Sequence, residues 1–479
     1  MNYGMIIQML GWVCCFESVF LLLPLIVAVL YGESAVYAYL ITMGMCALTG
    51  FFMTRHKVKS RKIYGREGLV IVSLSWIILS IFGAAPFVIS GDIPSFVDAL
   101  FETISGFTTT GSSILTNVEG LSHANLFWRS FTHWIGGMGV LVFILAILPI
   151  KSGNAGMYIM RAESPGPSVS KLVPKIRTTA MILYAIYFCM TVAQIIILLL
   201  AGMPLFDALT VSFGSAGTGG FAIKNNGLAG YTDLQQSIVT VAMILFGVNF
   251  NLYYLLLRRR TRQALACTEV WAYLGIIAVS ILVITISVIP QFPSVYQAFH
   301  HTAFQVSSII TTTGYSTLDY NGWPSIARTI LVLIMFIGAC AGSTGGGIKV
   351  SRILILLKGA WKEICRVCHP RSVRKVKMEG HSLENAVVHS VNAFIVIYLL
   401  IFVCSLLIIT LDEKDLVTNF TAVAATLNNI GPGLNVVGPA GNFSSFSAVS
   451  KIVLMFDMLA GRLELLPMLV LFVPATWKK

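Results

Sequence analysis

The sequence predicts an all-α integral membrane protein, in which two extra N-terminal transmembrane helices precede four repeats in a pseudo-four-fold arrangement. Composition is the first observation behind this prediction. Of the 479 residues, 56% are hydrophobic and only 11% are charged, and the mean hydropathy is +0.83; such values are typical of a multi-pass membrane protein. The second observation is a polar Thr/Gly turn that occurs four times, each time behind a short apolar stretch. A helix of about a dozen residues spans about 18 Å, too little to cross a hydrocarbon core about 30 Å thick.

The chain begins with two apolar spans, residues 5–31 and 35–53, without a polar turn between them. Residues 1–8 contain no basic residue, and no small-residue cleavage site follows the first span. We therefore expect a retained helix rather than a signal peptide. The two spans form an N-terminal pair, residues 1–60, outside the repeat.

Each repeat consists of a long apolar span, a short apolar helix, a polar turn and a closing segment. The repeats cover residues 61–150, 151–262, 263–378 and 379–479. The expected first spans are 68–90, 178–201, 270–290 and 386–411, the short helices 95–107, 205–215, 294–310 and 416–427, and the closing segments 127–149, 234–257, from 324 onward and 447–473. No single repeat of this size could enclose a path alone, so we expect the four to meet around one axis.

Basic residues mark one side of the membrane. Most of the 32 Lys and Arg residues fall in five blocks that separate pairs of apolar spans: 55–66, 151–177, 258–262, 349–377 and 478–479. Placing every block in the cytoplasm satisfies the positive-inside rule throughout. The net charge of +12 therefore indicates contact with anionic membrane lipids rather than with nucleic acid.

The four turns carry the predicted chemistry. The run Thr108-Thr109-Thr110-Gly111 recurs at 311–314, with looser copies at 216–220 and 428–431. Thirteen residues before the glycine of each turn stand Asp98, Asp207, His301 and Thr418, a spacing that favours Gly220 over Gly219 in the second turn. Glycine permits the backbone angles that aim successive carbonyl oxygens at one axis, and such oxygens replace the water that a monovalent cation sheds. Ordinary loop turns are the alternative, since Thr and Gly are common there too.

Four turns in one register favour the cation filter over loop turns. The predicted filter residues are Thr109, Thr110, Gly111, Thr218, Gly219, Gly220, Thr312, Thr313, Gly314, Asn429, Ile430 and Gly431. Whether threonine hydroxyls add to the carbonyl oxygens is left open. Each short helix would direct its C-terminus, with about half a unit of negative charge, towards the turn and so favour a cation there. Ser95 and Ser294 are predicted N-caps, and Asp98 is expected to belong to such a cap rather than to bind an ion.

These motifs resemble one family. The four turns, together with the runs 133–139 (HWIGGMG), 341–349 (AGSTGGGIK), 429–433 (NIGPG) and 461–464 (GRLE), are similar to those of the Trk/Ktr/HKT superfamily of potassium transporters. The two extra N-terminal spans are similar to those of the membrane subunit of the bacterial Trk potassium uptake system. The resemblance covers essentially the whole chain.

The resemblance implies four membrane-pore-membrane repeats and a gated, channel-like K⁺ uptake path in the bacterial plasma (inner) membrane. It implies that K⁺, the transported ion, is bound at Thr109, Thr110, Thr218, Gly219, Thr312, Thr313, Asn429 and Ile430. A homodimer and a cytosolic nucleotide-binding regulatory ring of the RCK type, on the basic inner face, are implied partners. A serine at the first filter glycine accompanies sodium permeation in this family, so Gly111 implies K⁺ selectivity. The second and fourth turns depart from the Thr-rich pattern, and a short, asymmetric filter is expected.

The closing segment of the third repeat is interrupted by glycines, each of which costs a helix about 1 kcal/mol relative to alanine. Irregular backbone at membrane depth is tolerated only where it lines a cavity or is buried in protein. We therefore expect a gate loop beneath the filter, with a close-packing bend as the alternative. The predicted gate residues are Gly342, Ser343, Thr344, Gly345, Gly346, Gly347, Lys349 and Arg462.

Two of these gate residues have alternatives of their own. Arg462 stands near the middle of the last span, where an arginine costs at least about 2.5 kcal/mol. The resemblance places it in the pore as an electrostatic barrier; a structural ion pair is the alternative. Lys349 could equally be a cytoplasmic anchor. Glu17, in the N-terminal pair, is expected to form an interhelical hydrogen bond rather than to carry protons.

Other functions are disfavoured. The run Cys365-Arg366-Val367-Cys368-His369 matches the spacing of c-type haem attachment, but it lies in a basic loop assigned to the cytoplasm, so no haem or organic cofactor is expected. The spans hold no His/Glu cluster, which argues against an enzyme. A cation-coupled secondary transporter with broken helices would favour an inverted two-fold repeat, whereas these four repeats share one orientation.

Overall fold

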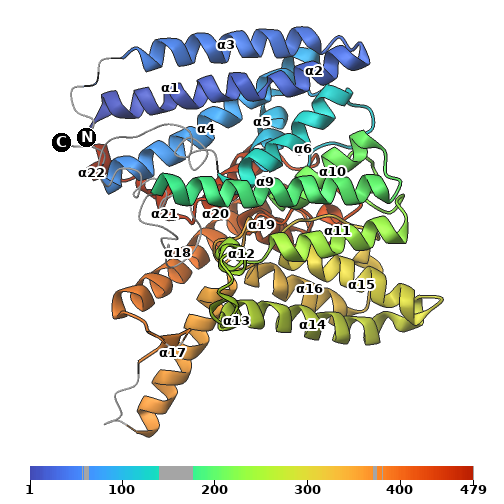
Figure 1. Ribbon diagram of the computed structural model, residues 1–479, viewed down its shortest axis with the longest axis vertical. Helices are drawn as coiled ribbons and strands as arrows, with labels where there is room; N and C mark the ends of the chain where they lie inside the picture. Colours follow the sequence, from blue (N-terminus) through green and yellow to red (C-terminus); the bar gives the residue numbers. More distant parts are fainter. Residues whose placement is uncertain (57, 59–63, 140–175, 370–374, 380, 478–479) are drawn as a thin grey trace.

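The computed structural model describes residues 1–56, 58, 64–139, 176–369, 375–379 and 381–477. Within these residues the fold is helical except for one short antiparallel pair, β1 (Lys377–Met378) and β2 (His381–Ser382). Six helices of the described part are long and apolar enough to cross a membrane, and a bent pair adds a seventh if it counts as one span. Several of these helices run side by side in Figure 1, with both chain ends at the same side. The predicted class, an all-α integral membrane protein, is confirmed.

The N-terminal pair consists of α1 (Tyr3–Phe20), α2 (Leu22–Tyr31) and α3 (Val36–Thr54). Glycines let α1 and α3 approach closely, because a Cβ on Gly50 would lie 2.6 Å from Cys15 Sγ. The expectation for Glu17 is wrong: its carboxylate is fully buried, and neither oxygen has a hydrogen-bond partner among the described residues. Glu17 instead lies behind Gly83 of α4, where a Cβ would be 3.4 Å from its Oε1.

A long helix, a short helix and a closing segment follow one another four times. The first group is α4 (Gly65–Ser90), α5 (Phe96–Phe107) and α6 (His123–Met138); the second is α9 (Ile176–Leu200), α10 (Leu205–Gly217), α11 (Asp233–Phe246) and α12 (Phe250–Leu257), followed by α13 (Thr261–Leu265). The third is α14 (Thr268–Val288), α15 (Val295–Ile310), α16 (Ser325–Ile337) and α17 (Val350–Cys368). The fourth is α18 (Asn385–Ile409), α19 (Leu416–Leu427), α20 (Ala448–Arg462), α21 (Leu466–Val470) and α22 (Pro474–Trp477).

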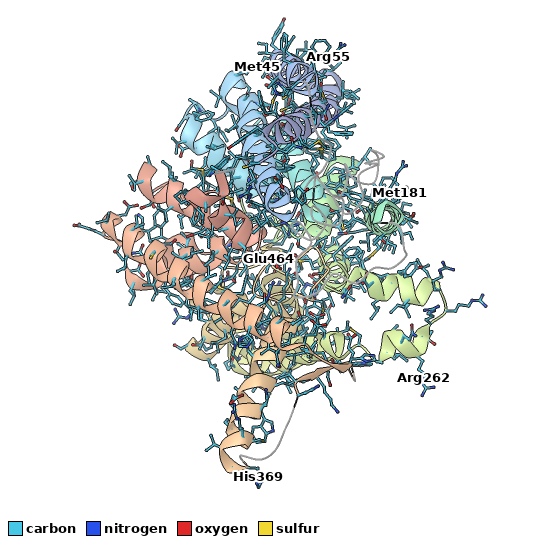
Figure 2. The ribbon with its side chains drawn as sticks, turned by 90° about the vertical axis from the view of Figure 1, so that its left-hand side faces the viewer. Met45, Arg55, Met181, Arg262, His369 and Glu464 are labelled. Atoms are coloured by element: carbon cyan, nitrogen blue, oxygen red, sulfur yellow. The ribbon has the colours of Figure 1, made fainter. Side chains whose placement is uncertain are left out.

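Single 3-10 turns lie between some of these helices: η1 (Ile289–Gln291), η2 (Tyr320–Gly322), η3 (Thr410–Asp412) and η4 (Asn435–Val437). The last helix of the third group, α17, projects from the body in Figure 1, and Figure 2 places His369 at its far end.

Three closing segments differ from the expected unbroken spans. In the first group the helix ends at Met138, and residues 140–149 lie outside the described residues. In the second, the span bends by 89° between α11 and α12, because Gly247 O accepts from Cys340 N at 3.1 Å and Phe250 N donates to Gly342 O at 3.0 Å. These bonds to the glycine-rich stretch replace helical ones. In the fourth, the helix stops at Arg462 and restarts at Leu466.

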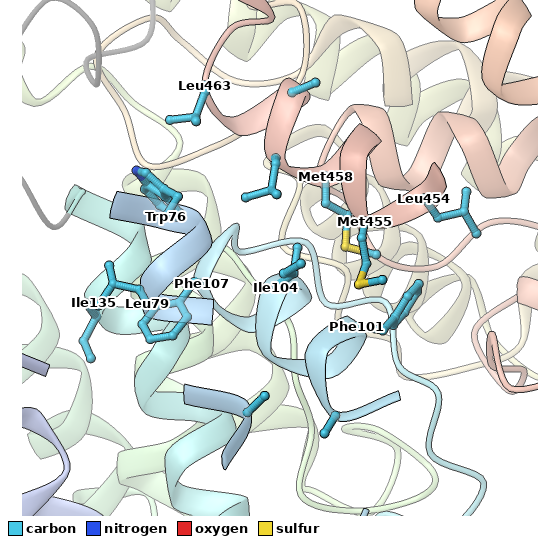
Figure 3. Packing of buried hydrophobic residues seen from close by; sticks show 14 of the residues in the cluster. Trp76, Leu79, Phe101, Ile104, Phe107, Ile135, Leu454, Met455, Met458 and Leu463 are labelled. Atoms are coloured by element: carbon cyan, nitrogen blue, oxygen red, sulfur yellow. The ribbon is translucent and has the colours of Figure 1, made fainter. Parts of the chain in front are cut away.

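The short helices are capped and buried. Ser95 Oγ accepts from Asp98 N at 3.4 Å and Ser294 Oγ from Gln297 N at 3.2 Å, as the N-cap pattern predicts. Asp415 caps α19 through Thr418 N at 3.0 Å, and its hydrogen bond from the Thr418 hydroxyl lowers the pKa of the Asp415 carboxyl. Figure 3 shows the core around α5, in which Phe101, Ile104 and Phe107 share one buried cluster with side chains of α4, α6 and α20.

The backbone N–H of Asp98 belongs to this cap, as predicted, and the side chain makes a further contact. Its carboxylate forms an ion pair with Lys451 Nζ at 2.6 Å, and this pair ties the short helix of the first group to α20 of the fourth.

Candidate functional site

The four short helices end in the same hydrogen-bonded turn. We call residues 108–111 turn 1, 217–220 turn 2, 311–314 turn 3 and 428–431 turn 4. In turn 1, Thr109 N donates to Gly106 O at 3.1 Å and Thr110 N to Ser105 O at 2.9 Å, which is the Schellman pattern of a helix C-terminus. The same pair of bonds, at 2.8–3.2 Å, ends the other three helices: Thr218 to Ser215, Gly219 to Gly214, Thr312 to Ile309, Thr313 to Ser308, Asn429 to Thr426 and Ile430 to Ala425.

The turns also share a strained backbone. One residue of each has a left-handed conformation, with φ between +55° and +58° at Thr109, Thr218, Thr312 and Asn429. Such angles cost a residue with a side chain about 1–2 kcal/mol and are rare for a β-branched one. Two residues later each turn has a glycine with positive φ: +80° at Gly111, +75° at Gly220, +83° at Gly314 and +100° at Gly431. By this criterion Gly220, not Gly219, is the equivalent of Gly111.

These glycines are where the four turns meet. A Cβ built on Gly111 would lie 2.0 Å from Gly219 O, and one on Gly220 only 1.9 Å from Thr313 O. The series continues with Gly314 against Ile430 O at 2.1 Å and closes with Gly431 against Thr110 O at 2.8 Å. The structure thus brings the predicted site residues of all four turns together in one closed ring, and the carbonyl beside each glycine comes from the equivalent position of the next turn.

The threonine hydroxyls hold the turns in place. Thr110 Oγ1 lies 2.8 Å from Thr108 Oγ1 and accepts a hydrogen bond from Asn429 Nδ2 at 2.9 Å, which links turn 1 to turn 4. In turn 3, Thr313 Oγ1 lies 2.8 Å from Thr311 Oγ1. The hydroxyls of Thr110 and Thr313 are thus engaged inside the protein, and backbone carbonyls are the oxygens of these residues left for a ligand.

His133, on α6, is a site residue to which sequence analysis assigned no role. Its ring is fully buried, with Nδ1 2.7 Å from Gly106 O and Nε2 accepting from Phe221 N at 3.2 Å. A neutral ring with the proton on Nδ1 satisfies both bonds. His133 therefore joins the end of α5 to the residue after turn 2, 88 positions along the chain.

A buried ion pair supports the same two turns from outside the ring. Arg129 and Glu102 lie 2.7 Å apart, both almost completely buried. The glutamate accepts from Ile114 N at 3.0 Å, and the arginine donates to Ala222 O at 3.1 Å. The signal available in the sequence was a charge inside an apolar segment, since such charges are retained only where they are paired.

A cavity of about 230 Å³ lies on one side of the ring. It is lined by the glycines of all four turns and by the segments that follow them, including Arg129 and Lys224. The opposite side is covered by the predicted gate segment, which we call the glycine loop (residues 341–349): a Cβ on Gly345 would lie 2.9 Å from Thr311 O and one on Gly346 2.5 Å from Asn428 O.

The glycine loop leaves α16 and returns beside it. Lys349 N donates to Ile337 O at 2.9 Å and Val350 N to Ala339 O at 3.1 Å, so the two ends of the loop run together. At its tip, Gly346 N donates to Thr312 Oγ1 at 2.6 Å. A filter-turn hydroxyl thus contacts the predicted gate directly.

Arg462 connects the loop to two other groups of helices. Its guanidinium donates to Thr344 O at 2.7 Å, to Gly136 O at 2.6 Å and to Gly137 O at 2.8 Å. Glu464, the carboxylate two residues beyond Arg462, pairs instead with Arg352 at 2.5 Å. Figure 2 shows Glu464 near the middle of the molecule.

The cytoplasmic-anchor alternative for Lys349 is wrong. The residue is 2% exposed, and its ammonium group donates to Gly345 O within the glycine loop. The geometry therefore groups Lys349 with the predicted gate residues.

Other predicted features lie away from the ring. Cys365 and Cys368 stand at the end of the projecting helix α17, and the described residues contain no group of three or more His, Cys, Asp or Glu side chains suited to a metal ion. His300 and His301, on α15, make hydrogen bonds to Gln236 (2.9 Å) and Thr317 (3.1 Å).

Known proteins resemble this chain over its full length. The family model named TrkH and described as a cation transport protein matches residues 36–291 and 264–479. The Trk system potassium uptake protein TrkH of Salmonella typhimurium is 37% identical, and the alignment covers 100% of both chains. TrkG of Escherichia coli, also named a Trk system potassium uptake protein, is 32% identical over 98% of each chain. The crystal structure of the potassium transporter TrkH from Vibrio parahaemolyticus superposes with a TM-score of 0.90 at 32% identity, covering 100% of both chains.

Proposed function

Because this chain belongs to the TrkH family of cation transport proteins, we propose that it carries K⁺ into the cell through the ring of turns 1–4. The ring is the selectivity filter of this proposal. Ions would move down their electrochemical gradient, and an inside-negative membrane potential contributes about 2.3 kcal/mol per 100 mV for each charge.

The closed ring of carbonyl oxygens is the observation that carries this proposal. Thr110 O, Gly219 O, Thr313 O and Ile430 O each lie against the glycine of a neighbouring turn, with no side chain between them. Carbonyl oxygens replace the hydration shell of a monovalent cation. Each of the four helices also directs a C-terminal partial charge of about −0.5 towards the ring, which favours a cation over an anion.

We propose that the glycine loop and Arg462 form the gate. The loop covers the ring on the side opposite the cavity. The positively charged guanidinium of Arg462 lies on the same side, where it donates hydrogen bonds to three carbonyl oxygens of the loop and of α6. A fixed cation on a cation path is an electrostatic barrier. Movement of the loop tip would break the bond from Gly346 N to Thr312 Oγ1 and open the path.

We propose that the protein resides in the bacterial inner membrane, with its basic loops in the cytoplasm as the positive-inside rule requires. A homodimer and a cytosolic nucleotide-binding regulatory ring on the basic face are the proposed partners. The projecting helix α17 supports a contact on that face, because it carries Lys358, Lys362 and Arg366 away from the body. Its side chains Leu357, Trp361 and Val367 are also exposed.

A cation-coupled symporter is the alternative, and the broken pair α11 and α12 is the feature that favours it. Purified protein in liposomes separates the two mechanisms. A channel-like path gives Rb⁺ uptake, and the reversal potential of the current through it follows the K⁺ gradient alone. A symporter shifts that reversal potential when the Na⁺ or H⁺ gradient is changed, and absence of Rb⁺ uptake would contradict both.

A further inference from the structure

Glu269 stands in the first turn of α14, outside the filter and outside the predicted gate residues, and its side chain is 5% exposed. One carboxylate oxygen, Oε1, accepts two backbone hydrogen bonds, from Ala341 N at 2.7 Å and from Ser351 N at 3.0 Å. These two N–H groups lie at opposite ends of the glycine loop. A single atom of α14 therefore joins the place where the loop begins to the place where α17 starts.

The two N–H groups need this acceptor. Ser351 is the second residue of α17, and the first N–H groups of a helix have no carbonyl partner within it. Ala341 N belongs to an irregular segment in the protein interior, where an unpaired N–H is destabilising. A carboxylate is the strongest acceptor available for both, and it also matches the positive end of the α17 dipole.

The other bonds of the loop show what Glu269 holds. Residues 336–339 are already paired backbone to backbone with residues 348–350. The tip is held by Thr312 and Arg462, which belong to turn 3 and α20. Gly247 and Phe250 hold the residues on either side of Ala341. Glu269 adds a bond from α14 to Ala341 itself and joins it to Ser351, at the other end of the loop.

We infer that Glu269 is a positioning residue that clamps the base of the glycine loop and keeps the loop in the covering position seen in this structure. The inference rests on the proposed function, since it assigns the clamp to the gate of that path. Loss of the acceptor leaves Ala341 N and Ser351 N, at the two ends of the loop, without their partner, while the filter turns keep all of their own hydrogen bonds.

The test compares basal Rb⁺ uptake into liposomes by the full-length protein and its variants. Glu269→Ala removes both bonds and should raise uptake tenfold or more. Glu269→Gln keeps an amide oxygen at the same position and should restore uptake to within about threefold of the unmodified protein. Glu269→Asp keeps the charge but shortens the side chain, and it should raise uptake to an intermediate level. This variant tests the clamp if Glu269→Ala does not fold.

The matched control is Glu67→Ala. Glu67 is also a first-turn glutamate of a long helix and is also 5% exposed. Its hydrogen bond within the described part of the chain comes from the backbone of Tyr64, at 3.0 Å, and not from the glycine loop. Its loss should leave basal uptake unchanged. An increase as large as that of Glu269→Ala would show a general effect of losing a buried glutamate and would overturn the inference.

Thiol labelling gives a readout that does not depend on transport. Cys340, directly before the loop, is 0% exposed, as are Cys14 and Cys46 in the N-terminal pair. In Glu269→Ala, mass spectrometry should show faster modification of Cys340 by N-ethylmaleimide while Cys14 and Cys46 stay protected. Protection of all three in both the alanine and aspartate variants, or uptake by Glu269→Gln as high as by Glu269→Ala, would overturn the clamp. If the unmodified protein takes up no Rb⁺, the proposed function fails and the labelling result still decides the clamp.

Discussion

Replacing Gly111 by alanine tests the ring at its tightest structural constraint. The substitution has two free-energy costs, and the structure allows each to be considered by itself. The first is conformational: φ at Gly111 is +80°, and an alanine held in the left-handed region costs about 1–2 kcal/mol. The second is steric: the new methyl group would lie 2.0 Å from Gly219 O, whereas Cβ atoms essentially never approach another atom closer than 3.0 Å. The two turns must therefore separate by about 1 Å at this contact, because the methyl group meets backbone rather than a flexible side chain.

Gly91 provides the matched control, because it separates the conformational cost from the steric one. It has φ of +82°, almost the same as Gly111, but a Cβ there would meet no atom within 4 Å. Gly91→Ala therefore carries the backbone cost without the displaced carbonyl. In a thermal unfolding assay Gly91→Ala should lose the conformational part of the stability alone and Gly111→Ala should lose more, and only Gly111→Ala should lose transport.

The measurement is Rb⁺ uptake into liposomes at matched protein content. A misplacement of about 1 Å can cost a positioned reaction about 100-fold, so uptake by Gly111→Ala should fall at least about tenfold, which corresponds to about 1.4 kcal/mol. The surviving flux should also discriminate less between K⁺ and Na⁺ in reversal-potential measurements. Equal uptake by Gly111→Ala and Gly91→Ala would refute the assignment of the carbonyl ring as the filter.

Three further predictions concern the gate and the support of the ring. Arg462→Ala removes the charge and the bond to Thr344 O, and basal Rb⁺ uptake should rise severalfold; unchanged or reduced uptake would contradict the gate. Thr312→Val removes the acceptor of Gly346 N and should also raise basal uptake, whereas Thr312→Ser, which keeps the hydroxyl, should not; equal uptake by the two variants counts against this contact. His133→Ala leaves a buried backbone N–H without a partner, at a cost of about 1–3 kcal/mol, and should weaken K⁺ over Na⁺ selectivity more than His133→Gln does, as reversal potentials would show.

Much of the architecture could be predicted from local sequence. The long spans and short helices follow from the length of apolar stretches, because a hydrocarbon core sets a minimum length for a crossing helix. The common register of the turns follows from the thirteen-residue spacing, and the structure shows a φ of +75° at Gly220, close to the +80° at Gly111. Ser95 and Ser294 cap their helices as expected, since N-capping involves only residues three positions apart.

The breaks in the closing helices could not be predicted in this way. Residues 234–257 contain no charged residue, and the 89° bend arises because Cys340 and Gly342, at the start of the glycine loop, bond to the backbone of Gly247 and Phe250. Breaks of this kind depend on a partner that no window of local sequence contains.

Sequence alone determined that this chain is a membrane protein with four equivalent polar turns behind short helices, because helix length, glycine content and charge placement are local properties that a lipid bilayer selects directly. Only the tertiary structure decided which atoms meet. It closed the turns into a ring, joined His133 to Phe221, placed Arg462 on Thr344, and brought Glu269 to both ends of the glycine loop. Those contacts join residues dozens to hundreds of positions apart, and a buried hydrogen bond depends on three-dimensional placement to within a few tenths of an ångström.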